Sequence, residues 1–374
     1  MHEIDGYITD FYREGKSHRY TGQLSDDFQR ALAKFYVDPP KDQCTFYHTM
    51  EFPCGEVVPG AWDLRRREQV YLGYVDFSGQ RVLELGSATG YLGFYMEAQG
   101  AGVVCFDLPI RTPPDIIPLP TTLRSKRLYE HASLTEKLHK SWWYGHAKLN
   151  SKNKAVYGDI YNLPDDLGDF DIATLGCILL HLRDPFAALQ QAACRTEKAI
   201  IVTDVVWTPL EMKRALMEFN PGNPPEYPTN WWGISPGAVS RMLNILGFSS
   251  IDIYYHTQKH RPVHNIGGSS FTDKCLFTIV GQRHPHYVDR HPMPESEVAI
   301  QAELARQWLA DPDIEALNAR ISQLNAQISQ FNAEISHLNL QISHFQEQVD
   351  ALKSSTSWRL TAPIRLVGRI LKGR

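Results

Sequence analysis

Several features that mark common protein classes are absent or scarce in this sequence. The six cysteines include no Cys-x-x-Cys pair, so a disulfide scaffold is not indicated. No run approaches the 18 or more apolar residues that span a bilayer. The first sixteen residues lack the basic region and apolar core of a secretion signal. We therefore expect a reduced, cytoplasmic protein whose only membrane contact would be peripheral, on the inner face.

Basic residues are not in excess, because 38 Lys and Arg stand against 42 Asp and Glu, for a net charge of −4. A dedicated nucleic-acid binder usually carries the opposite balance, so we do not expect a nucleic acid as partner. The length of 374 residues allows two or three folded units at about 150 residues each.

What the sequence does contain is an alternation of short apolar runs with helix-length segments. The runs occupy 81–85, 103–107, 154–159, 169–176, 198–205, 251–255 and 275–281. Near-continuous apolar strands separated by helices predict a parallel sheet covered on both faces, and the last two runs are close enough to form an antiparallel pair. We expect an α/β fold, a doubly wound and mostly parallel seven-stranded sheet over 81–282, preceded by an N-terminal helical or lid segment over 1–80.

Two connections in this domain are rich in proline and aromatic residues. One has five prolines between 109 and 120 and continues to Trp142 and Trp143; the other is 219–236, with Trp231 and Trp232. Prolines disfavour regular structure, so we expect loops or short helices that carry aromatics over one end of the sheet.

The tryptophan pairs suggest the kind of substrate. Indole faces can lie against the C–H face of a sugar ring, which makes Trp142, Trp143 and Trp232 candidate substrate contacts, although packing is the alternative for each pair. His146, beside the first pair, is a weaker candidate base.

After the domain, residues 283–312 form a segment rich in Pro and His, which we interpret as a linker. Its histidines have no second ligand cluster, so no metal site is expected.

A seven-residue repeat follows over 313–352. Apolar residues recur at Ile314, Ile321, Ile328, Ile335, Ile342 and Val349, and three positions later at Leu317, Leu324, Phe331, Leu338, Phe345 and Leu352. Six such heptads predict a C-terminal coiled-coil helix, and branched residues at the first position with Leu at the second favour a parallel dimer. We expect a homodimer through 314–352; the alternative is a helix folded back onto its own domain.

The last segment, 353–374, holds six basic residues and no acidic one. As a helix it would place Leu360, Ile364, Val367 and Leu371 on one face, and such a tail suits an anionic membrane surface. A solvated basic tail is the alternative.

Acidic residues end three successive predicted strands around one glycine-rich turn. Glu84 precedes Gly86, Ser87 and Gly90, whose spacing lacks the G-x-G-x-x-G of the common dinucleotide motif. Glycines let backbone approach a ligand closely, and a helix start offers free N–H groups.

The other two acids lie one and two strands further on. Asp107, followed by Leu108, can accept both hydroxyls of a ribose. Asp159 could accept an adenine amino group while Ile160 packs on the ring. Together the three acids predict a pocket for an adenosine that carries positive charge.

These residues resemble the class I S-adenosylmethionine-dependent methyltransferases over about 45–282. The resemblance rests on ELGSATG (84–90), Asp107, GDIYNLP (158–164) and FDIATLGCILLHLRDPFAAL (170–189). It implies that Glu84, Gly86 and Gly90 surround the methionine part of the cofactor, Asp107 the ribose, and Asp159 with Ile160 the adenine. Ala88 stands where many members have the middle glycine.

Two shorter stretches carry further resemblances. YHTMEFPCGEVVPGAWDLRRR (47–67) and LLHLRDP (179–185) are similar to the branch of tRNA wobble-uridine carboxymethyltransferases, whose basic RNA surface is not evident in this composition. SSTSWRLTAPIRLVGRIL (354–371) is similar to tails of bacterial polysaccharide glycosyltransferases.

Methyl transfer to a hydroxyl needs aligned partners and a base. His181, after the fourth strand, is the first candidate base, with a loop hydrogen bond as the alternative. Asp184 is expected to cap the helix that begins at Pro185. His48 and Arg65 lie in the possible lid and are candidate substrate contacts.

The sequence therefore predicts an enzyme that uses S-adenosylmethionine to O-methylate a sugar of a surface polysaccharide or its precursor. Other acceptors left open are a tRNA base and a small natural product. A third reading is a non-catalytic scaffold whose coiled coil recruits glycosyltransferases.

Overall fold

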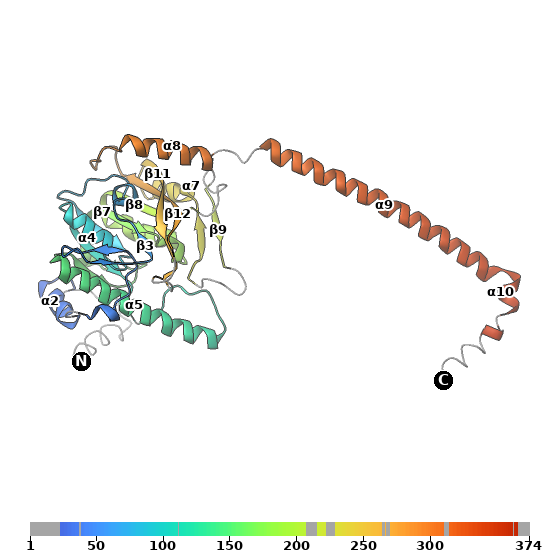
Figure 1. The fold of residues 1–374 in the computed structure, drawn as a ribbon, viewed down its shortest axis with the longest axis horizontal. Coiled ribbons are helices and arrows are strands. Elements are labelled where there is room, and N and C mark those ends of the chain that lie inside the picture. The colour runs from blue at the N-terminus through green and yellow to red at the C-terminus, as the bar shows by residue number, and fades with distance from the viewer. Residues whose placement is uncertain are drawn as a thin grey trace. The chain divides into compact units, whose positions relative to one another are not determined.

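The computed structural model describes residues 23–36, 39–110, 112–206, 215–221, 229–263, 266, 270–309, 314–361 and 363–365, without the side chains of 122 and 305–326. It divides into two units, 1–309 and 310–374. The first contains the predicted sheet with its helices (Figure 1).

The main sheet has the strand order β3-β11-β12-β8-β7-β4-β5-β6. Its strands are β3 (Trp62–Asp63), β4 (Arg81–Leu85), β5 (Gly102–Asp107), β6 (Lys154–Tyr157), β7 (Phe170–Gly176), β8 (Thr196–Val205), β11 (Ser250–His260) and β12 (Thr272–Gln282). The neighbours from β8 to β6 pair in parallel, whereas β12 pairs antiparallel with both β8 and β11. The mostly parallel sheet of seven strands is confirmed, and two-residue β3 joins it as an eighth along β11.

Alternating side chains of the central strands point to two cores. Val82, Ile172 and Ile201 pack in one core with α4 (Tyr91–Ala98) and the buried part of α5 (Thr121–Leu149). Leu83, Ala173 and Ile200 pack in the other, with α6 (Pro185–Cys194) and α7 (Pro236–Ile245). The period of two in a strand therefore produces helices on both faces, as a doubly wound sheet requires.

The segment expected as N-terminal and helical is mixed in structure over its described part. It contains α2 (Asp26–Phe35), η1 (Lys41–Gln43), β1 (Met50–Glu51), β2 (Val57–Val58), β3 and α3 (Glu68–Tyr71). Residues 1–22 of the expected segment lie outside the described residues. Because β3 bonds to the edge of β11, part of this segment belongs to the main sheet.

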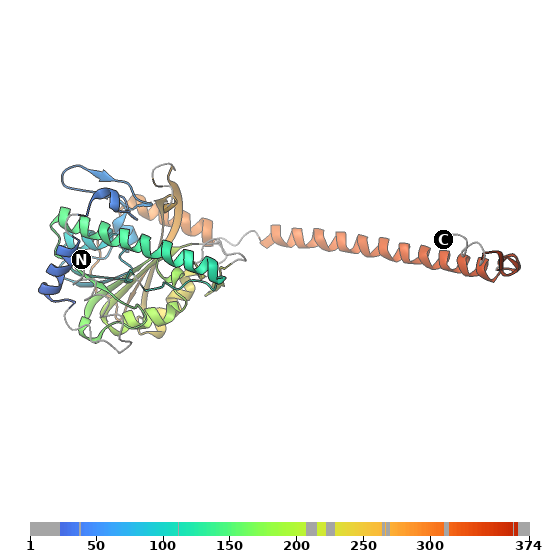
Figure 2. The ribbon, with the colours of Figure 1, turned by 90° about the horizontal axis from the view of Figure 1, so that it is seen from below.

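The first proline-rich connection differs from the expectation of loops or short helices. No helix or strand forms over 112–120, but residues 121–149 form the 29-residue helix α5, which Figure 2 shows along one side of the first unit. The prolines end at Pro120, so nothing after that point interrupts the helix.

The remaining short elements follow the strands. They are η2 (Asp165–Leu167), η3 (Leu179–His181), β9 (Met217–Phe219) and β10 (Trp232–Ile234), the last two paired antiparallel. Asp184 caps α6 as predicted, because its Oδ1 accepts a hydrogen bond from Ala187 N at 2.9 Å.

The expected linker 283–312 contains a helix, α8 (Glu295–Leu309). Glu297 forms a bidentate ion pair with Arg67, and the Gln301 amide bonds to the backbone N–H and C=O of Tyr255 on β11. The prediction of a linker was wrong here because these contacts join residues far apart in sequence.

The second unit consists of α9 (Ile314–Ser354) followed by α10 (Thr356–Leu360). Ser355 caps α10, with its Oγ accepting from Trp358 N at 3.2 Å. The predicted tail helix is thus described only at its start, and residues 366–374 lie outside the described residues. None of the helices in the described parts of the chain combines the length and apolar character needed to span a bilayer.

Candidate functional site

The turn between β4 and α4 is built from residues in the left-handed region. Gly86 (φ +79°), Ala88 (φ +48°) and Gly90 (φ +77°) all lie there, a conformation that disfavours a Cβ. Gly86 N donates to Phe106 O, and Gly90 N donates to Ser87 O, each at 2.8 Å. The turn is therefore tight, and Ala88 adopts the strained geometry for which a glycine would be better suited.

Asp107 ends β5 beside this turn, as predicted. Its Oδ2 accepts hydrogen bonds from Ala88 N at 2.7 Å and from Ser87 Oγ at 3.5 Å, and its Oδ1 accepts from Leu108 N at 2.6 Å. A carboxylate has about four acceptor sites, so capacity remains for a ligand's hydroxyl groups. Burial raises the pKa of Asp107 to about 6, against the lowering effect of these bonds.

Glu84 is buried one residue before the end of β4. Its Oε2 accepts a weak hydrogen bond from Cys105 Sγ at 3.2 Å, and a Cβ on Gly93 would lie 2.6 Å from the same oxygen. Burial raises the pKa of Glu84 to about 8. Neither Glu84 nor Asp107 has an ion-pair partner within the described part of the chain.

Asp159 lies exposed just beyond the end of β6, where its Oδ1 accepts from Tyr161 N at 2.9 Å. Ile160 is half-buried against the second core. The strands β4, β5 and β6 are neighbours, so the three acids predicted from the sequence share one edge of the sheet.

Asp115, in the proline-rich connection, ties together the segments beyond that edge. Its Oδ2 accepts from Arg183 N at 2.7 Å and from the hydroxyl of Tyr161, while its carbonyl accepts from Trp231 Nε1 at 2.6 Å. The guanidinium of Arg183 lies 5.2 Å from the Trp231 ring centroid. The sequence analysis missed Asp115, because nothing local distinguishes it from other loop acids.

The N-terminal segment touches the glycine turn through His48. Its backbone N and its Nδ1 each lie 3.4 Å from Thr89 Oγ1, and its ring lies 5.8 Å from that of Tyr91. Burial lowers the pKa of His48 to about 3, so the ring is neutral at physiological pH. The predicted lid residue therefore packs directly on the turn.

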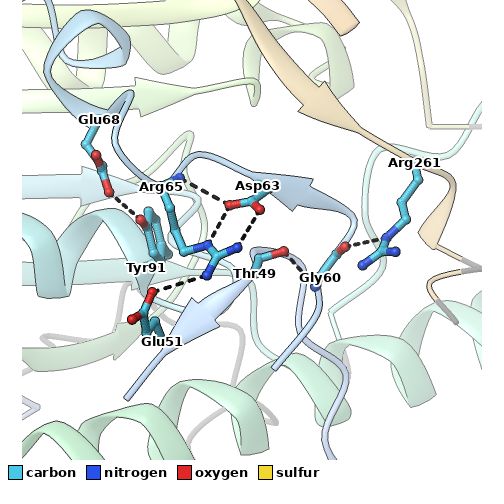
Figure 3. A network of polar contacts seen from close by, with 8 residues as sticks. All are labelled: Thr49, Glu51, Gly60, Asp63, Arg65, Glu68, Tyr91 and Arg261. Carbon is cyan, nitrogen blue, oxygen red and sulfur yellow. Dashed lines mark hydrogen bonds and ion pairs between the residues drawn. The ribbon is translucent and has the colours of Figure 1, made fainter. Parts of the chain in front are cut away.

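Arg65 is held by carboxylates of its own segment (Figure 3). Its Nε and one terminal nitrogen each bond an oxygen of Asp63 at 2.8 Å, and the other terminal nitrogen bonds Glu51 at 3.2 Å. A substrate anion would have to compete with both acids, which weakens the prediction that Arg65 contacts substrate.

The same view shows what fixes this segment to the sheet. Gly60 N donates to Thr49 Oγ1 and Arg261 Nε donates to Gly60 O, each at 3.0 Å (Figure 3). Arg261 follows β11, so these bonds hold the segment to the strand that β3 joins.

The first tryptophan pair does not form a sugar platform. Trp142 and Trp143 are buried in the first core, where a Cβ on Gly90 would lie 2.5 Å from the Trp142 ring. His146 stacks on Trp142 at 5.0 Å. All three lie on α5, and the packing alternative is correct for the pair because a helix over the sheet must bury its apolar stripe.

The second pair differs. Trp231 is buried and bonded to Asp115, whereas Trp232 is half-buried, donates from Nε1 to Arg183 O at 3.2 Å and lies 5.5 Å from the Phe219 ring. Phe219 is exposed. Trp232 therefore stays a candidate substrate contact.

His181 is the last residue of η3. Its Nδ1 lies 3.0 Å from Thr229 O, so a neutral ring donates from Nδ1 and keeps Nε2 as an acceptor. Burial lowers its pKa, which leaves the ring unprotonated and able to act as a base. The role of His181 stays a prediction.

A further acid at this edge was missed. Asp204 is the penultimate residue of β8 and is 1% exposed. The signal was present, because Asp204 ends an apolar run just as Asp107 does. Within the described residues no group of three or more His, Cys, Asp or Glu side chains could hold a metal ion.

The strand order, with β12 inserted antiparallel between β8 and β11, is that of the Rossmann-like methyltransferase fold. No family model matches the chain, and no curated protein matches it.

Solved structures show a loose likeness. The N-terminal domain of EvdMO1 with SAH bound has a TM-score of 0.40 at 16% identity, covering 70% of this chain and 99% of that one. An O-methyltransferase family protein from Burkholderia thailandensis has a TM-score of 0.36 at 11% identity, covering 75% and 68%. Magnesium protoporphyrin IX methyltransferase from Synechocystis, with bound SAH, has a TM-score of 0.34 at 13% identity, covering 74% and 93%. At these values the fold class rests on the strand order itself.

Proposed function

We propose that this chain is a methyltransferase that uses S-adenosylmethionine. The observation that carries the proposal is the edge formed by β4, β5 and β6, where buried Glu84 and turn-bonded Asp107 lie at the strained glycine turn and Asp159 follows the neighbouring strand. Buried carboxylates without a cation are costly, and a ligand with a positive charge would relieve that cost. The cofactor carries that charge on its sulfur.

The residues at this edge fit the parts of such a cofactor. Asp107 would bind the ribose hydroxyls, Asp159 the adenine amino group beside Ile160, and Glu84 with Gly86, Ser87 and Gly90 would surround the methionine part. Bound there, the cofactor supplies a methyl group for in-line displacement. The chain would align the methyl group with the acceptor, and the segments that Asp115 joins would exclude water from the site.

For the acceptor we propose a sugar hydroxyl of a surface polysaccharide or its precursor. Trp232, with exposed Phe219 beside it, offers an aromatic face at the same edge of the sheet. The resemblance of 354–371 to glycosyltransferase tails also favours a carbohydrate. A tRNA base or a small natural product is the alternative, and comparing methyl incorporation into lipid-linked glycan and into tRNA separates them.

We further propose that the chain dimerises through 314–352. Each apolar side chain of the repeat that lies in the described stretch 328–352 is 45% to 62% exposed. Burying the exposed part of each side chain would contribute about 1 kcal/mol. Two chains together have sixteen such side chains over 328–352. The sum is comparable to or larger than the roughly 4–15 kcal/mol cost of association.

The tail extends this proposal to the membrane and to partners. Trp358, Leu360 and Ile364 are exposed, with the Arg365 guanidinium 3.7 Å from the Trp358 ring centroid. We propose peripheral binding to an anionic leaflet, where glycosyltransferases of the same pathway could be recruited. Sedimentation with anionic vesicles should require 356–374, and equal binding by the truncated chain would contradict the proposal.

Isothermal titration with S-adenosylmethionine tests the central claim. Asp107→Ala removes charge-assisted hydrogen bonds worth about 1.5–3 kcal/mol each, so we expect affinity to fall roughly 10- to 100-fold. Asp169→Ala, an exposed acid before β7 at the opposite edge, is the matched control and should bind normally. A folded wild-type chain that shows no binding would rule the proposal out, and would favour the scaffold alternative.

A further inference from the structure

Asp204 stands out among the buried acids because one of its oxygens has no partner. Oδ1 accepts from Val205 N at 2.7 Å, whereas Oδ2 is buried and accepts no hydrogen bond of normal geometry, although the Leu180 N–H acts on the carboxyl group. A buried polar atom left unpaired costs about 1–3 kcal/mol. An unpaired buried oxygen beside a proposed ligand site therefore suggests a functional role for the residue.

Three side chains whose pKa values are raised by the charge of Asp204 come from three separate segments. Cys177 follows β7, Tyr71 ends α3 and Tyr47 belongs to the N-terminal segment. The Tyr71 hydroxyl donates to Cys177 Sγ at 3.6 Å. Burial first, and then the charge of Asp204, raises the pKa of Cys177, and Asp204 acts in the same direction on the pKa of Tyr47 and of Tyr71.

The backbone at Cys177 is strained, with φ at +49°, and its N–H donates to Thr203 O at 2.7 Å. A left-handed non-glycine residue costs energy and persists only where the surroundings demand it. The strain turns the chain so that Ile178 lies against the glycine turn: a Cβ on Gly86 would be 3.1 Å from Ile178 Cδ1. Ile178 therefore lies against Gly86, while Cys177 bonds to the residue that precedes Asp204.

The pKa of Asp204 is suited to a group that accepts a proton near neutral pH. Burial raises its pKa to about 7, although the backbone N–H groups of Val205 and Leu180 lower it. A base works best with a pKa near the working pH. His181 stays the alternative base, and Asp204 differs from it in having a buried oxygen atom without a hydrogen bond.

We propose that Asp204 is the general base, and that Tyr47, Tyr71 and Cys177 line the acceptor side of the site. This inference rests on the proposed function. As the bond from the acceptor oxygen to the methyl carbon forms, the bond from that carbon to sulfur breaks and the hydroxyl proton moves to Asp204 Oδ2. The acceptor leaves as a methyl ether, and the carboxyl group then releases its proton to solvent. Tyr47, only half-buried, is the side chain that would give way to the acceptor.

A crystal of the full chain with S-adenosylmethionine tests the geometry without any acceptor. An attacking oxygen lies about 3–3.5 Å from the methyl carbon and about 2.6–3.2 Å from its base, so Oδ2 should lie roughly 4–6 Å from that carbon. A bound cofactor with Oδ2 more than about 8 Å away would overturn the inference. A crystal without cofactor would instead overturn the proposed function.

Asp204→Asn tests the chemistry. We expect its affinity for S-adenosylmethionine to stay within about twofold, while methyl transfer to a lipid-linked glycan or to p-nitrophenyl hexosides falls at least 100-fold. The acid limb of the wild-type pH profile, near pH 7, should disappear. Asp171→Asn, a half-buried acid at the opposite end of β7, is the control, and both variants are first checked for an unchanged melting temperature. Retained activity with an unchanged pH profile would overturn the inference. If neither acceptor is methylated by the wild type, the distance from Oδ2 to the methyl carbon in the crystal is the test.

Discussion

The glycine turn and helix α9 each have side chains without a suitable partner, polar ones at the turn and apolar ones along the helix. At the turn the chain buries Glu84 and half-buries Asp107, and neither carboxyl group has an ion-pair partner among the described residues. Along α9 it leaves apolar side chains such as Ile335 and Phe345 more than half exposed. Each arrangement is unfavourable in the isolated chain, because charge prefers water and apolar surface avoids it.

The difference indicates what each region would bind. Carboxyl groups whose ionised form is disfavoured by burial are stabilised in that form by a compact cation that fits between strand ends, which a small ligand can supply. The exposed apolar stripe over 328–352 is covered only by a surface of matching length and the same period, which a second copy of the helix supplies. The three predictions below change one region and leave the other intact.

The largest effect is expected along α9. Ile335→Lys with Ile342→Lys places two charges in the proposed seam, where each would be buried without a partner, so the dimer should dissociate completely. Light scattering of the full chain should give twice the single-chain mass for the wild type and the single-chain mass for the variant. Binding of S-adenosylmethionine should be unchanged.

The matched control is Ala333→Lys with Leu340→Lys, which adds the same charge on the outer face of the heptad. Leu340 is 71% exposed and lies outside the repeat, so this variant should keep the wild-type mass. A wild-type mass equal to one chain would contradict the dimer and support the helix folded back on its own domain.

An intermediate effect is expected from pH. Burial raises the pKa of Glu84 to about 8 and of Asp107 to about 6, so the folded state holds protons that the unfolded state has already lost above about pH 4.5. The stability that these two groups contribute is therefore fully present below that pH and is lost as pH rises through 6 and 8, whereas the buried neutral ring of His48, whose pKa is lowered to about 3, contributes in the opposite direction. Since one pKa unit corresponds to about 1.4 kcal/mol, the contribution of these two groups should fall by about 5 kcal/mol between pH 5 and 8, measured by urea unfolding as the difference between the wild type and a Glu84→Gln, Asp107→Asn variant.

Two ligands that differ in charge test whether the raised pKa values belong to the cofactor site. The sulfonium of S-adenosylmethionine should favour the ionised carboxylates and release protons on binding near pH 7. S-adenosylhomocysteine, which lacks that charge, should release fewer. Calorimetry in two buffers of different ionisation enthalpy measures both, and Glu84→Gln should reduce the difference. Equal proton release for the two ligands would show that the buried acids do not face the sulfur.

The smallest effect is expected at Ala88. Its left-handed backbone costs about 1–2 kcal/mol with a Cβ, while glycine adds about 0.5–1 kcal/mol of unfolded-state entropy. Ala88→Gly should therefore stabilise the chain by up to about 1 kcal/mol in urea unfolding, without changing the mass. Ala98→Gly, at the end of α4, should destabilise it by a similar amount. Destabilisation by both would mean that the turn is not strained.

Much of the cofactor site could be predicted because its signals are local. Glu84, Asp107 and Asp159 each end an apolar run, and parallel strands bring their carboxyl ends to one edge. Asp204 carries the same signal and could have been found by applying the same reasoning to 198–205. Asp115 could not, because it is defined by bonds to Tyr161, Arg183 and Trp231.

The tryptophan pairs show where local reasoning ends. Both pairs follow proline-rich segments, yet Trp142 and Trp143 fill a core while Trp232 remains half-buried beside Arg183. The same holds for β3, which pairs with β11 about 200 positions further along the chain, and for α8, whose Glu297 forms an ion pair with Arg67, 230 positions away.

The sequence by itself determined the alternation of strands and helices, the tight glycine turn and the heptad stripe. Each of these depends on the spacing of neighbouring residues, and backbone geometry converts such spacing directly into local structure. Only the tertiary structure decided which aromatics became core, how Arg65 is paired and why Asp204 has an unbonded oxygen. Burial and pairing depend on which distant segments pack together, and that information is spread over the whole chain.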